Sequence, residues 1–271
     1  MNAEIQSKLD HLLKLLAGLD SVVVGFSAGV DSTFLAAAAS RSLGDKVVAA
    51  TAYSATLSAS EREEAVAIAN RLGICHILLH IDELESAEFA ANTSQRCYYC
   101  KRTRFGALSQ WAKAEGYSWV LDGANADDCL DYRPGMKAIV ELEGVCSPLL
   151  EVGLTKAEIR EISREWRLPT WNKPSAACLS SRVAYGLSIT KERLEQIEQA
   201  EKVIREFCSG QIRVRHHDKL ARIEVSQADI PVLSASENAR RIHSALKQLG
   251  FSFVTLDLAG YRIGSMNETL E

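Results

Sequence analysis

The chain has 271 residues, of which 47% are hydrophobic and 24% are charged. This composition is that of a globular protein with a sizeable core, and it excludes a disordered chain, which would be poorer in apolar residues. Lysine and arginine together number 31 against 35 acidic residues, a net charge of −4. That balance argues against a protein that wraps a long nucleic acid.

Cysteine usage and the apolar runs point to the cytoplasm. The seven cysteines are odd in number and mostly scattered, whereas secreted disulfide scaffolds are short and cysteine-dense. Residues 1–20 lack the basic start and apolar stretch of a signal peptide, and the longest apolar run, 34–39, falls far short of the ~20 residues of a membrane span. We expect a soluble, cytoplasmic protein with reduced thiols and neither a membrane nor a nucleic-acid partner.

The first two thirds of the chain alternate between expected strands and helices. Helices are predicted over residues 5–16, 33–43, 58–72, 97–115 and 155–166, and strands over 21–26, 46–53, 74–80 and 118–122. Ser58 with Glu61, and Thr155 with Glu158, have the spacing of capping boxes. Strands alternating with such helices form right-handed βαβ units, so the predicted fold class is α/β with a parallel sheet covered on both faces.

The pattern changes after Pro169. Residues 171–188 are too rich in Pro, Ser and Gly for regular structure, and we expect them to form a functional connector. Beyond them, the sequence predicts a small α+β domain with helices over 190–207 and 235–249 and strands over 212–217, 221–225 and 251–258. The predicted division is therefore a first domain over 1–170, the connector over 171–188 and a C-terminal domain over 189–271.

The loop after the first strand has the character of a phosphate site. Residues 27–32, Ser-Ala-Gly-Val-Asp-Ser, lie between a buried strand and a helix N-terminus, where unpaired N–H groups and the helix dipole attract an anion. The small residues let the backbone approach closely, and Asp31 can anchor the loop or meet a magnesium ion. The bland alternative is an ordinary βα turn whose Ser and Asp side chains cap the helix.

This loop resembles the SGGxDS pattern of the PP-loop ATP pyrophosphatases, which carry an adenine nucleotide alpha hydrolase-like domain. Ala28 stands in place of the first glycine, and adds roughly 1 kcal/mol of strain if that position needs a positive φ. The resemblance implies that ATP is cut between its α and β phosphates, which turns a carboxylate oxygen into a good leaving group as AMP. It assigns ATP binding to Ser27, Ala28, Gly29, Val30, Asp31, Ser32, Ser54, Gly123 and Asp128.

An acidic stretch over residues 122–135 follows a later strand. Ligands collect at the carboxyl edge of such sheets, so Asp127 and Asp128 are candidates to hold Mg²⁺. The alternative is a solvated acidic loop.

Cys97 and Cys100 are separated by two residues at a predicted helix start. The pair fits half of a zinc site, a redox pair, two ligands of a cluster or two packed thiols. Zinc needs two more ligands, and the adjacent His216 and His217 would project in opposite directions on a strand. Three thiolates suffice for an iron–sulfur cluster with one open iron.

The third thiol is Cys178, in the connector. Lys173 and Arg182 lie near it in sequence, and cations of this kind would lower its pKa and make it a better nucleophile or ligand. The remaining cysteines, at positions 75, 129, 146 and 208, are expected to be merely packed.

Six segments together resemble one enzyme family, the ATP-dependent sulfur transferases of nickel-pincer nucleotide synthesis (LarE type), which serve lactate racemase. They cover nearly the whole chain in order: GFSAGVDST, CYYCK, DGANADDCLDYRPG, WNKPSAACLSSRVAYG, IRVRHH and VTLDLAGYRIGSMNE. The resemblance implies a pyridinium-3,5-dicarboxylate mononucleotide that is adenylated on a carboxylate and converted to a thiocarboxylate. It also implies a homo-oligomer, a hexamer built around the small domain, while the sulfide source stays open.

The family has two subtypes. One gives up the sulfur of the cysteine that matches Cys178, and the other binds a [4Fe-4S] cluster through three cysteines and passes on an extra sulfide. Because this chain has Cys97, Cys100 and Cys178, it resembles the cluster subtype. The implied cofactors are ATP, Mg²⁺ and the [4Fe-4S] cluster, and the implied catalytic residues are Asp31 and the three cysteines.

The resemblance also supplies a substrate-phosphate site, at Ser181, Arg182, Arg213 and Arg215. On the predicted strand Arg213 and Arg215 share one face and form a fork for an anion; the alternative is a salt-bridged sheet surface. Glu201 and Glu224 match acidic family positions and are weaker candidates for binding a metal.

Three rival functions remain open at this stage. A tRNA thiolase would also use a PP-loop, but the acidic charge and the lack of a recognisable RNA-binding module argue against it. An amidation enzyme like the NAD or GMP synthetases would leave Cys178 without a task. A non-catalytic nucleotide-binding or iron–sulfur protein is the third.

Overall fold

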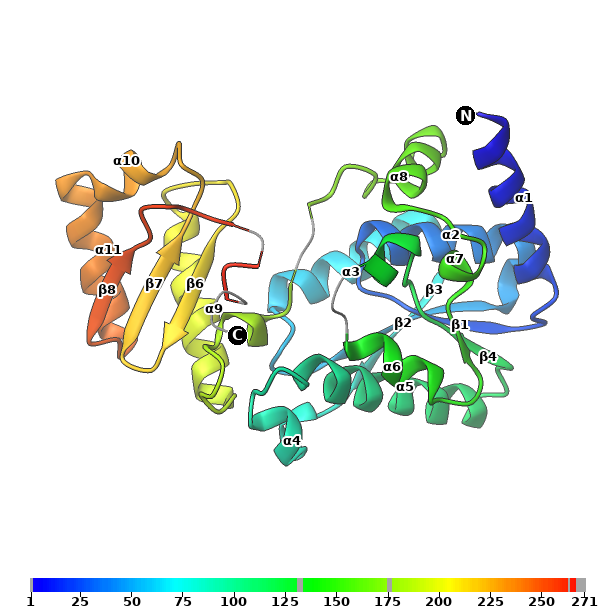
Figure 1. Ribbon diagram of the computed structural model, residues 1–271, viewed down its shortest axis with the longest axis horizontal. Coiled ribbons are helices and arrows are strands. Elements are labelled where there is room, and N and C mark those ends of the chain that lie inside the picture. Colours follow the sequence, from blue (N-terminus) through cyan, green and yellow to red (C-terminus); the bar gives the residue numbers. More distant parts are fainter. Residues whose placement is uncertain (1, 131–133, 175–176, 263, 267–271) are drawn as a thin grey trace. The chain divides into compact units, whose positions relative to one another are not determined.

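A computed structural model describes residues 2–130, 134–174, 177–262 and 264–266 (Figure 1). The chain divides into two compact units, which are described separately. The first comprises Met1–Glu83 and Cys97–Ala176, and the second comprises Leu84–Arg96 and Ala177–Glu271. Leu84–Arg96, which no sequence pattern separates from its neighbours, thus belongs with the C-terminal part of the chain.

The first unit is built around a five-stranded sheet in the order β3-β2-β1-β4-β5. All neighbouring strands pair in parallel, which confirms the predicted α/β class. The chain passes from β1 outward to β3 and then returns to the other side of β1, so the topology switches between β1 and β4, where open α/β sheets bind ligands. The strands are β1 (Val22–Gly25), β2 (Val47–Tyr53), β3 (Cys75–His80), β4 (Trp119–Leu121) and β5 (Val145–Cys146).

Helices cover both faces of this sheet (Figure 1). Val22 and Val24 pack in one hydrophobic core and Val23 in the other, as the two-residue period of a strand requires. The first core is closed by α1 (Ala3–Ala17), α2 (Val30–Leu43), α3 (Ala59–Leu72), α7 (Pro148–Glu151) and α8 (Lys156–Glu165). The second is closed by α5 (Arg96–Ala114) and α6 (Pro134–Val140).

Local signals in the sequence set the helix starts. Both predicted capping boxes form: Ser58 and Glu61 cap α3, and Thr155 and Glu158 cap α8. Each such cap satisfies N–H groups that a helix start leaves unpaired and contributes about 1 kcal/mol. Among the helices that the structure describes, none combines the length and apolar character needed to cross a membrane.

The second unit confirms the predicted small α+β domain. Its three strands, in the order β6-β7-β8, form a mixed sheet in which β6 and β7 are antiparallel and β7 and β8 are parallel. Two long helices pack on one face of the sheet around a core that includes Val214 and Ile223. The elements are α4 (Ala87–Ala90), α9 (Lys191–Arg205), β6 (Arg213–His217), β7 (Leu220–Glu224), α10 (Ile230–Ser234), α11 (Ser236–Gln248) and β8 (Phe253–Leu256).

The stretches predicted to be irregular contain short helices. A 3₁₀ helix spans Ala126–Leu130 and α6 starts at Pro134, inside the predicted loop, and a second 3₁₀ helix, Leu179–Arg182, lies in the predicted connector. Elements of four to seven residues are too short to show a helical periodicity. The patterns that mark long helices therefore do not extend to them.

Candidate active site

The loop between β1 and α2 has the geometry expected of a phosphate site. Ala28 is fully buried and has a φ of +52°, the left-handed conformation that favours glycine. The structure thus meets the condition under which the alanine was expected to add strain. Ser27 and Ser32 approach one another across the loop, with their hydroxyl oxygens 3.1 Å apart, while Gly29 precedes the first residue of α2 in extended conformation.

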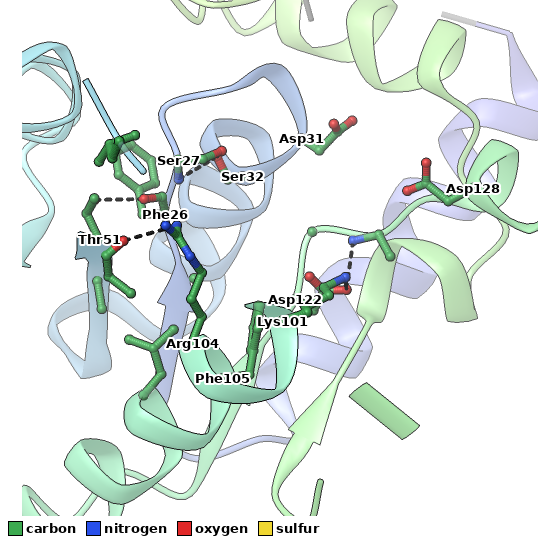
Figure 2. Close-up of a pocket in the computed structure, with 17 residues that line it drawn as sticks. Phe26, Ser27, Asp31, Ser32, Thr51, Lys101, Arg104, Phe105, Asp122 and Asp128 are labelled. Atoms are coloured by element: carbon green, nitrogen blue, oxygen red, sulfur yellow. Dashed lines mark hydrogen bonds and ion pairs between the residues drawn. The ribbon is translucent and has the colours of Figure 1, made fainter. Parts of the chain in front are cut away.

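A cavity of about 280 Å³ opens beside this loop (Figure 2). It lies at the carboxyl ends of β1 and β4, where the topology switches. Of the predicted ATP-binding residues, those that line it are Ser27, Asp31, Ser32, Gly123 and Asp128. The described lining does not include Ala28, Gly29, Val30 or Ser54; Ser54 is instead buried in the loop after β2, where its hydroxyl accepts a hydrogen bond from Thr56 N.

The charged groups around the cavity are arranged in pairs. Lys101 Nζ lies 2.9 Å from Asp122 Oδ2. Both residues line the cavity, and Figure 2 shows their side chains next to one another. On the loop itself, Asp31 forms an ion pair with Lys156 from the start of α8. These pairs balance the charge locally, and a nucleotide with its metal ion can exchange partners with them, phosphate for carboxylate and metal for lysine.

Sequence reasoning did not assign Lys101 and Arg104 to the nucleotide. Both line the cavity from α5, together with Phe105 and Leu108. The signal was present in their three- and four-residue spacing, which puts these side chains on one face of the helix. Arg104 is held by Glu83, a fully buried carboxylate whose Oε1 lies 2.5 Å from Arg104 Nε.

The two predicted magnesium ligands of the acidic stretch point to different places. Asp128 is buried and lines the cavity, and its Oδ2 accepts a hydrogen bond from Asn125 N. Asp127 is exposed, and its Oδ2 accepts from Lys156 N at 2.9 Å, the first residue of α8. The geometry therefore brings Asp128, with Asp31, to the cavity, whereas Asp127 satisfies a helix terminus.

Two of the predicted cluster cysteines lie in the first two turns of α5. Cys97 is exposed, while Cys100 is partly buried with its Sγ 3.8 Å from Glu83 Oε1. Cys178 is partly buried in the second unit, at the residue before the 3₁₀ helix Leu179–Arg182. In the described part of the chain, no group of three His, Cys, Asp or Glu side chains is arranged to hold a metal ion, so the cluster stays a prediction.

The other cysteines divide into two classes. Cys208 is buried, and burial raises the pKa of the Cys146 thiol to about 12, as expected for packed thiols. Cys75 and Cys129, by contrast, are exposed, so the expectation that they are packed was wrong. Cys75 lies on β3, a strand at the edge of the sheet in which every residue is at least partly exposed.

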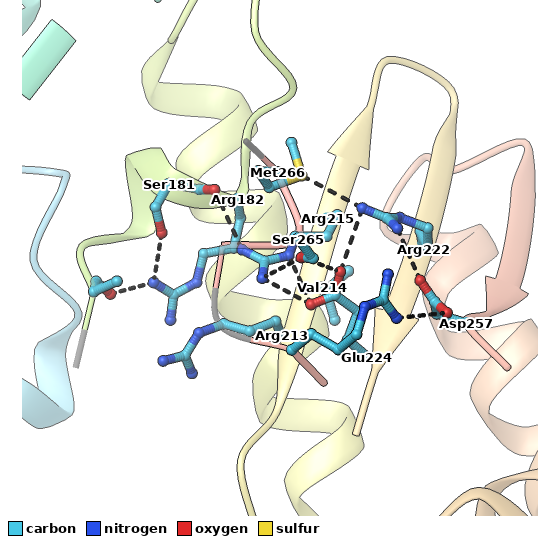
Figure 3. Close-up of polar contacts among 12 residues, drawn as sticks. Ser181, Arg182, Arg213, Val214, Arg215, Arg222, Glu224, Asp257, Ser265 and Met266 are labelled. Atoms are coloured by element: carbon cyan, nitrogen blue, oxygen red, sulfur yellow. Dashed lines mark hydrogen bonds and ion pairs between the residues drawn. The ribbon is translucent and has the colours of Figure 1, made fainter. Parts of the chain in front are cut away.

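The second unit carries a cluster of buried arginines (Figure 3): Arg213 and Arg215 lie on the sheet face opposite the helices, and Arg182 lies at the end of the 3₁₀ helix Leu179–Arg182. Val214 points into the core, so its neighbours Arg213 and Arg215 share the other face, as predicted. Arg215 Nη2 lies 2.7 Å from Glu224 Oε2, and Arg182 Nε lies 2.9 Å from Glu201 Oε1. Each of these four side chains is at least nine-tenths buried.

Arg213 differs from its neighbours because it has no carboxylate partner among the described residues. Its Nη1 donates to Ile212 O at 2.7 Å, and its guanidinium lies over the Tyr261 ring. Burial, together with repulsion from Arg182, lowers the pKa of Arg213 below its ordinary value. Figure 3 shows the guanidinium groups of Arg182 and Arg213 pointing to the same side, near the Ser181 hydroxyl. Two cations and a hydroxyl so placed form a site for an anion such as phosphate.

The acidic residues Glu201 and Glu224 already have partners. Glu201 Oε1 also accepts a hydrogen bond from Val214 N, and Glu224 Oε1 accepts one from Ser265 Oγ at 2.8 Å. In this structure both carboxylates neutralise buried arginines. Their predicted role as metal ligands stays a prediction, and it would require these ion pairs to be exchanged.

The fold and the phosphate loop define the class of the first unit, an α/β nucleotide-binding domain of the PP-loop type. In agreement, the family model described as NAD synthase matches residues 4–126. This range extends from α1 through β4 to the start of the acidic stretch, and so contains the loop and most of the cavity lining.

Relatives that match this chain along almost its whole length identify its family within the PP-loop class. An uncharacterized protein of Synechocystis is 41% identical over 98% of this chain and 99% of its own length. The pyridinium-3,5-bisthiocarboxylic acid mononucleotide synthase of Lactiplantibacillus plantarum is 36% identical over 99% of this chain and 96% of its own. An uncharacterized protein of Methanocaldococcus jannaschii is 28% identical over 94% of this chain and 96% of its own. The chain belongs to the family of the pyridinium-3,5-bisthiocarboxylic acid mononucleotide synthase.

Proposed function

We propose that this protein is an ATP-dependent sulfurtransferase. It adenylates a carboxylate of a pyridinium-3,5-dicarboxylate mononucleotide and converts it to a thiocarboxylate. The observation that carries the proposal is the cavity beside the Ser27–Ser32 loop in a chain that is 36% identical, along almost its whole length, to a synthase of that product class.

The first step is activation of the carboxylate. Its oxygen attacks the α-phosphorus of ATP, the bond from that phosphorus to the bridging oxygen breaks, and pyrophosphate leaves. The N-terminus of α2 and the Ser27 and Ser32 hydroxyls are suited to hold phosphate oxygens, and Lys101 adds a cation at the same cavity. Asp31 and Asp128 supply the carboxylates that Mg²⁺ prefers, and the bound ion would neutralise charge on the leaving pyrophosphate.

The second step transfers sulfur. Sulfur attacks the acyl carbon, the bond from that carbon to the oxygen shared with phosphorus breaks, and AMP leaves with the oxygen. The mononucleotide phosphate is held by Arg182, Arg213 and Ser181, with Arg215 behind them. Arg215 Nη1 donates to Ser181 O at 3.3 Å, which fixes the backbone of this anion site.

Cys97, Cys100 and Cys178 would hold a [4Fe-4S] cluster that would supply the sulfide, or the sulfur comes from Cys178 itself, whose Cβ–Sγ bond then breaks by elimination and leaves dehydroalanine. Three thiolates fit the donor set of such a cluster, which would leave one iron open to carry sulfide. A contact inside the second unit supports the cluster: Arg96 Nη1 donates to Ser180 O at 3.1 Å. Arg96 directly precedes Cys97, and Ser180 follows Cys178 by two residues.

The family resemblance extends the proposal to the biological setting. We propose a cytoplasmic homo-oligomer that supplies the nickel-pincer cofactor of lactate racemase. Size-exclusion chromatography with light scattering tests the oligomeric state.

Pyrophosphate release tests the activation step. With ATP, Mg²⁺ and the pyridinium mononucleotide, the protein is expected to form AMP and pyrophosphate in equal amounts, and to form neither without the mononucleotide. Asp31→Asn should strongly lower the rate, because that carboxylate lines the cavity, whereas Asp45→Asn, at an exposed position in the same unit, should leave it unchanged. Release that does not depend on the mononucleotide would contradict the proposal.

Iron loading tests the cluster separately. Anaerobic reconstitution with iron and sulfide should give a brown protein with about four irons per chain. Cys97→Ala, Cys100→Ala and Cys178→Ala should each lower the iron content, while Cys75→Ala, which removes an exposed thiol on strand β3, should not. Equal iron content in all four variants would contradict the cluster but not the proposed activation of the carboxylate by ATP.

A further inference from the structure

Lys173 occupies a place that the sequence did not predict. Its side chain was expected near Cys178, yet Lys173 belongs to the first unit, where its Nζ donates a hydrogen bond to Ala28 O at 3.0 Å. The same ammonium group lies 2.7 Å from Glu64 Oε2 on α3. The lysine therefore contacts the backbone of the phosphate loop, although 145 residues separate it from Ala28 in sequence.

The carbonyl that Lys173 contacts belongs to the strained residue of the loop. Ala28 has a φ of +52° and no access to solvent. An alanine in this conformation lacks the freedom of glycine, so other contacts must hold it there. Lys173 supplies a charge-assisted hydrogen bond to that peptide, which is stronger than a bond between neutral groups.

Fixing the carbonyl also fixes the following N–H group. In a planar trans peptide the C=O and the N–H point in opposite directions. With Ala28 O turned toward Lys173, the N–H of Gly29 turns to the other side, where it donates a long hydrogen bond to Ser27 Oγ, with 3.4 Å between the nitrogen and the oxygen; a bound phosphate oxygen would take the place of this hydroxyl as acceptor. Ser27 lines the cavity, so this N–H is directed to the side of the loop where an anion would lie.

Lys173 is itself held by α8. Arg160 Nη1 donates to Trp171 O at 2.7 Å, and Arg160 Nη2 donates to Lys173 O at 2.8 Å. The lysine backbone N–H donates to Thr170 O at 2.9 Å. These bonds fix the segment before the connector, so that the Lys173 side chain approaches the loop from a defined point.

We propose that Lys173 is a positioning residue for the nucleotide. It holds the Ala28–Gly29 peptide in the orientation in which the Gly29 N–H donates to a phosphate of ATP. This inference rests on the proposed function, because it takes ATP as the ligand of the cavity. It assigns to the lysine of the WNKP segment a task in nucleotide binding, separate from the thiol chemistry of Cys178.

The test is binding of the α,β-methylene analogue of ATP with Mg²⁺ to the full chain, measured by calorimetry. Lys173→Met should raise the Kd about tenfold, the size expected for one charge-assisted bond, and Lys173→Arg should recover most of the loss. Glu64→Gln removes only the outer ion pair and should change the Kd less than about twofold, as for other half-exposed pairs. In pyrophosphate release, Lys173→Met should raise the KM for ATP more than it lowers kcat.

A double-substitution cycle distinguishes an effect of Lys173 through the Ala28–Gly29 peptide from direct electrostatic attraction between its ammonium group and ATP. In an Ala28→Gly background the loop adopts a positive φ without a Cβ penalty, so Lys173→Met should weaken binding less than it does in the natural chain. The same loss in both backgrounds, or an unchanged Kd for Lys173→Met, would overturn the proposal while leaving ATP as the ligand. If the natural chain does not bind the analogue, the proposed function fails together with this inference. Circular dichroism and the thermal midpoint verify that each variant is folded.

Discussion

The two proposed anion sites of this protein are built in different ways. Beside the phosphate loop, the groups suited to bind phosphate are largely backbone N–H groups at the start of α2, and the side-chain cations Lys101 and Lys156 are paired with carboxylates. In the second unit the binding groups are arginine side chains on a sheet face, and Arg213 is left without a carboxylate among the described residues.

This difference determines what each site depends on. A backbone site depends on the conformation of its loop, so it is sensitive to residues that hold the peptides in place, such as Ala28 and Lys173. A side-chain site depends on charges that are costly to bury, so it is sensitive to the carboxylates that neutralise them, Glu201 and Glu224. Substitutions at each site therefore test whether the two sites differ in this way.

Removing a buried carboxylate of the arginine cluster should have the largest effect. Glu224→Ala leaves Arg215 buried without its partner and deprives Arg222 of one, and should lower the free energy of unfolding by about 3–5 kcal/mol. Urea unfolding measures the loss. Glu237→Ala, an exposed position in the first turn of α11, serves as the control; a similar small change in both variants would mean that the cluster does not depend on its carboxylates.

Removing Arg213 should affect binding rather than folding. Arg213→Met should weaken binding of the pyridinium mononucleotide by roughly 10–100-fold, the loss of one strong phosphate contact, with little change in the urea midpoint. Arg215→Met, by contrast, should destabilise the protein, because it leaves Glu224 buried without that partner. Calorimetry and urea unfolding on both variants measure binding and stability separately. Equal destabilisation by the two substitutions would mean that Arg213 stabilises the fold as Arg215 does.

The cation of the nucleotide cavity should have a smaller effect. Lys101→Met should raise the KM for ATP about tenfold, as for one phosphate contact, because Lys101 lies in the cavity beside Asp122. Lys113→Met changes a lysine in the last turn of the same helix, away from the cavity, and should leave the KM unchanged. Initial rates of pyrophosphate release over a range of ATP concentrations decide between the two outcomes.

Mild acid should weaken the second unit slightly. Burial lowers the pKa of His216 to about 4, below its ordinary value near 6.5. Between these values the unfolded chain binds more protons than the folded one, so stability falls as the pH falls from 7 to 6. His216→Phe should give a shallower decline in the urea midpoint, with a remainder from His217, whose pKa burial also lowers. An unchanged slope would show that His216 is not the group that titrates.

The sequence was most informative where the signal is local. The Ser27–Ser32 loop, the capping boxes of α3 and α8, and the shared face of Arg213 and Arg215 all depend on residues within a few positions of each other. These patterns were enough to predict the α/β sheet and the small α+β domain, and the predicted phosphate loop lies beside a cavity.

What the sequence could not show depends on contacts between distant segments. Lys173 contacts Ala28, which is 145 residues away in the sequence. Asn92 joins the segment Leu84–Arg96 to the rest of the second unit through hydrogen bonds to the carbonyls of Val183, Ala184 and Leu187. Such partners are set by packing, which a single sequence does not encode in any local pattern. For the same reason Asp127 and Asp128, adjacent in sequence, could not be told apart before the structure showed where each points.

In the proposed reaction, a carboxylate oxygen of the substrate becomes bonded to the phosphorus of AMP and leaves with it when sulfur takes its place. The direct measurement uses a pyridinium mononucleotide whose carboxylates carry a heavy oxygen isotope, with mass spectrometry of the AMP and of the thiocarboxylate product. If the carboxylate is adenylated first, each AMP formed carries one heavy oxygen, and the product has lost one heavy oxygen in exchange for sulfur. AMP without the label, alongside product that contains sulfur, would contradict it.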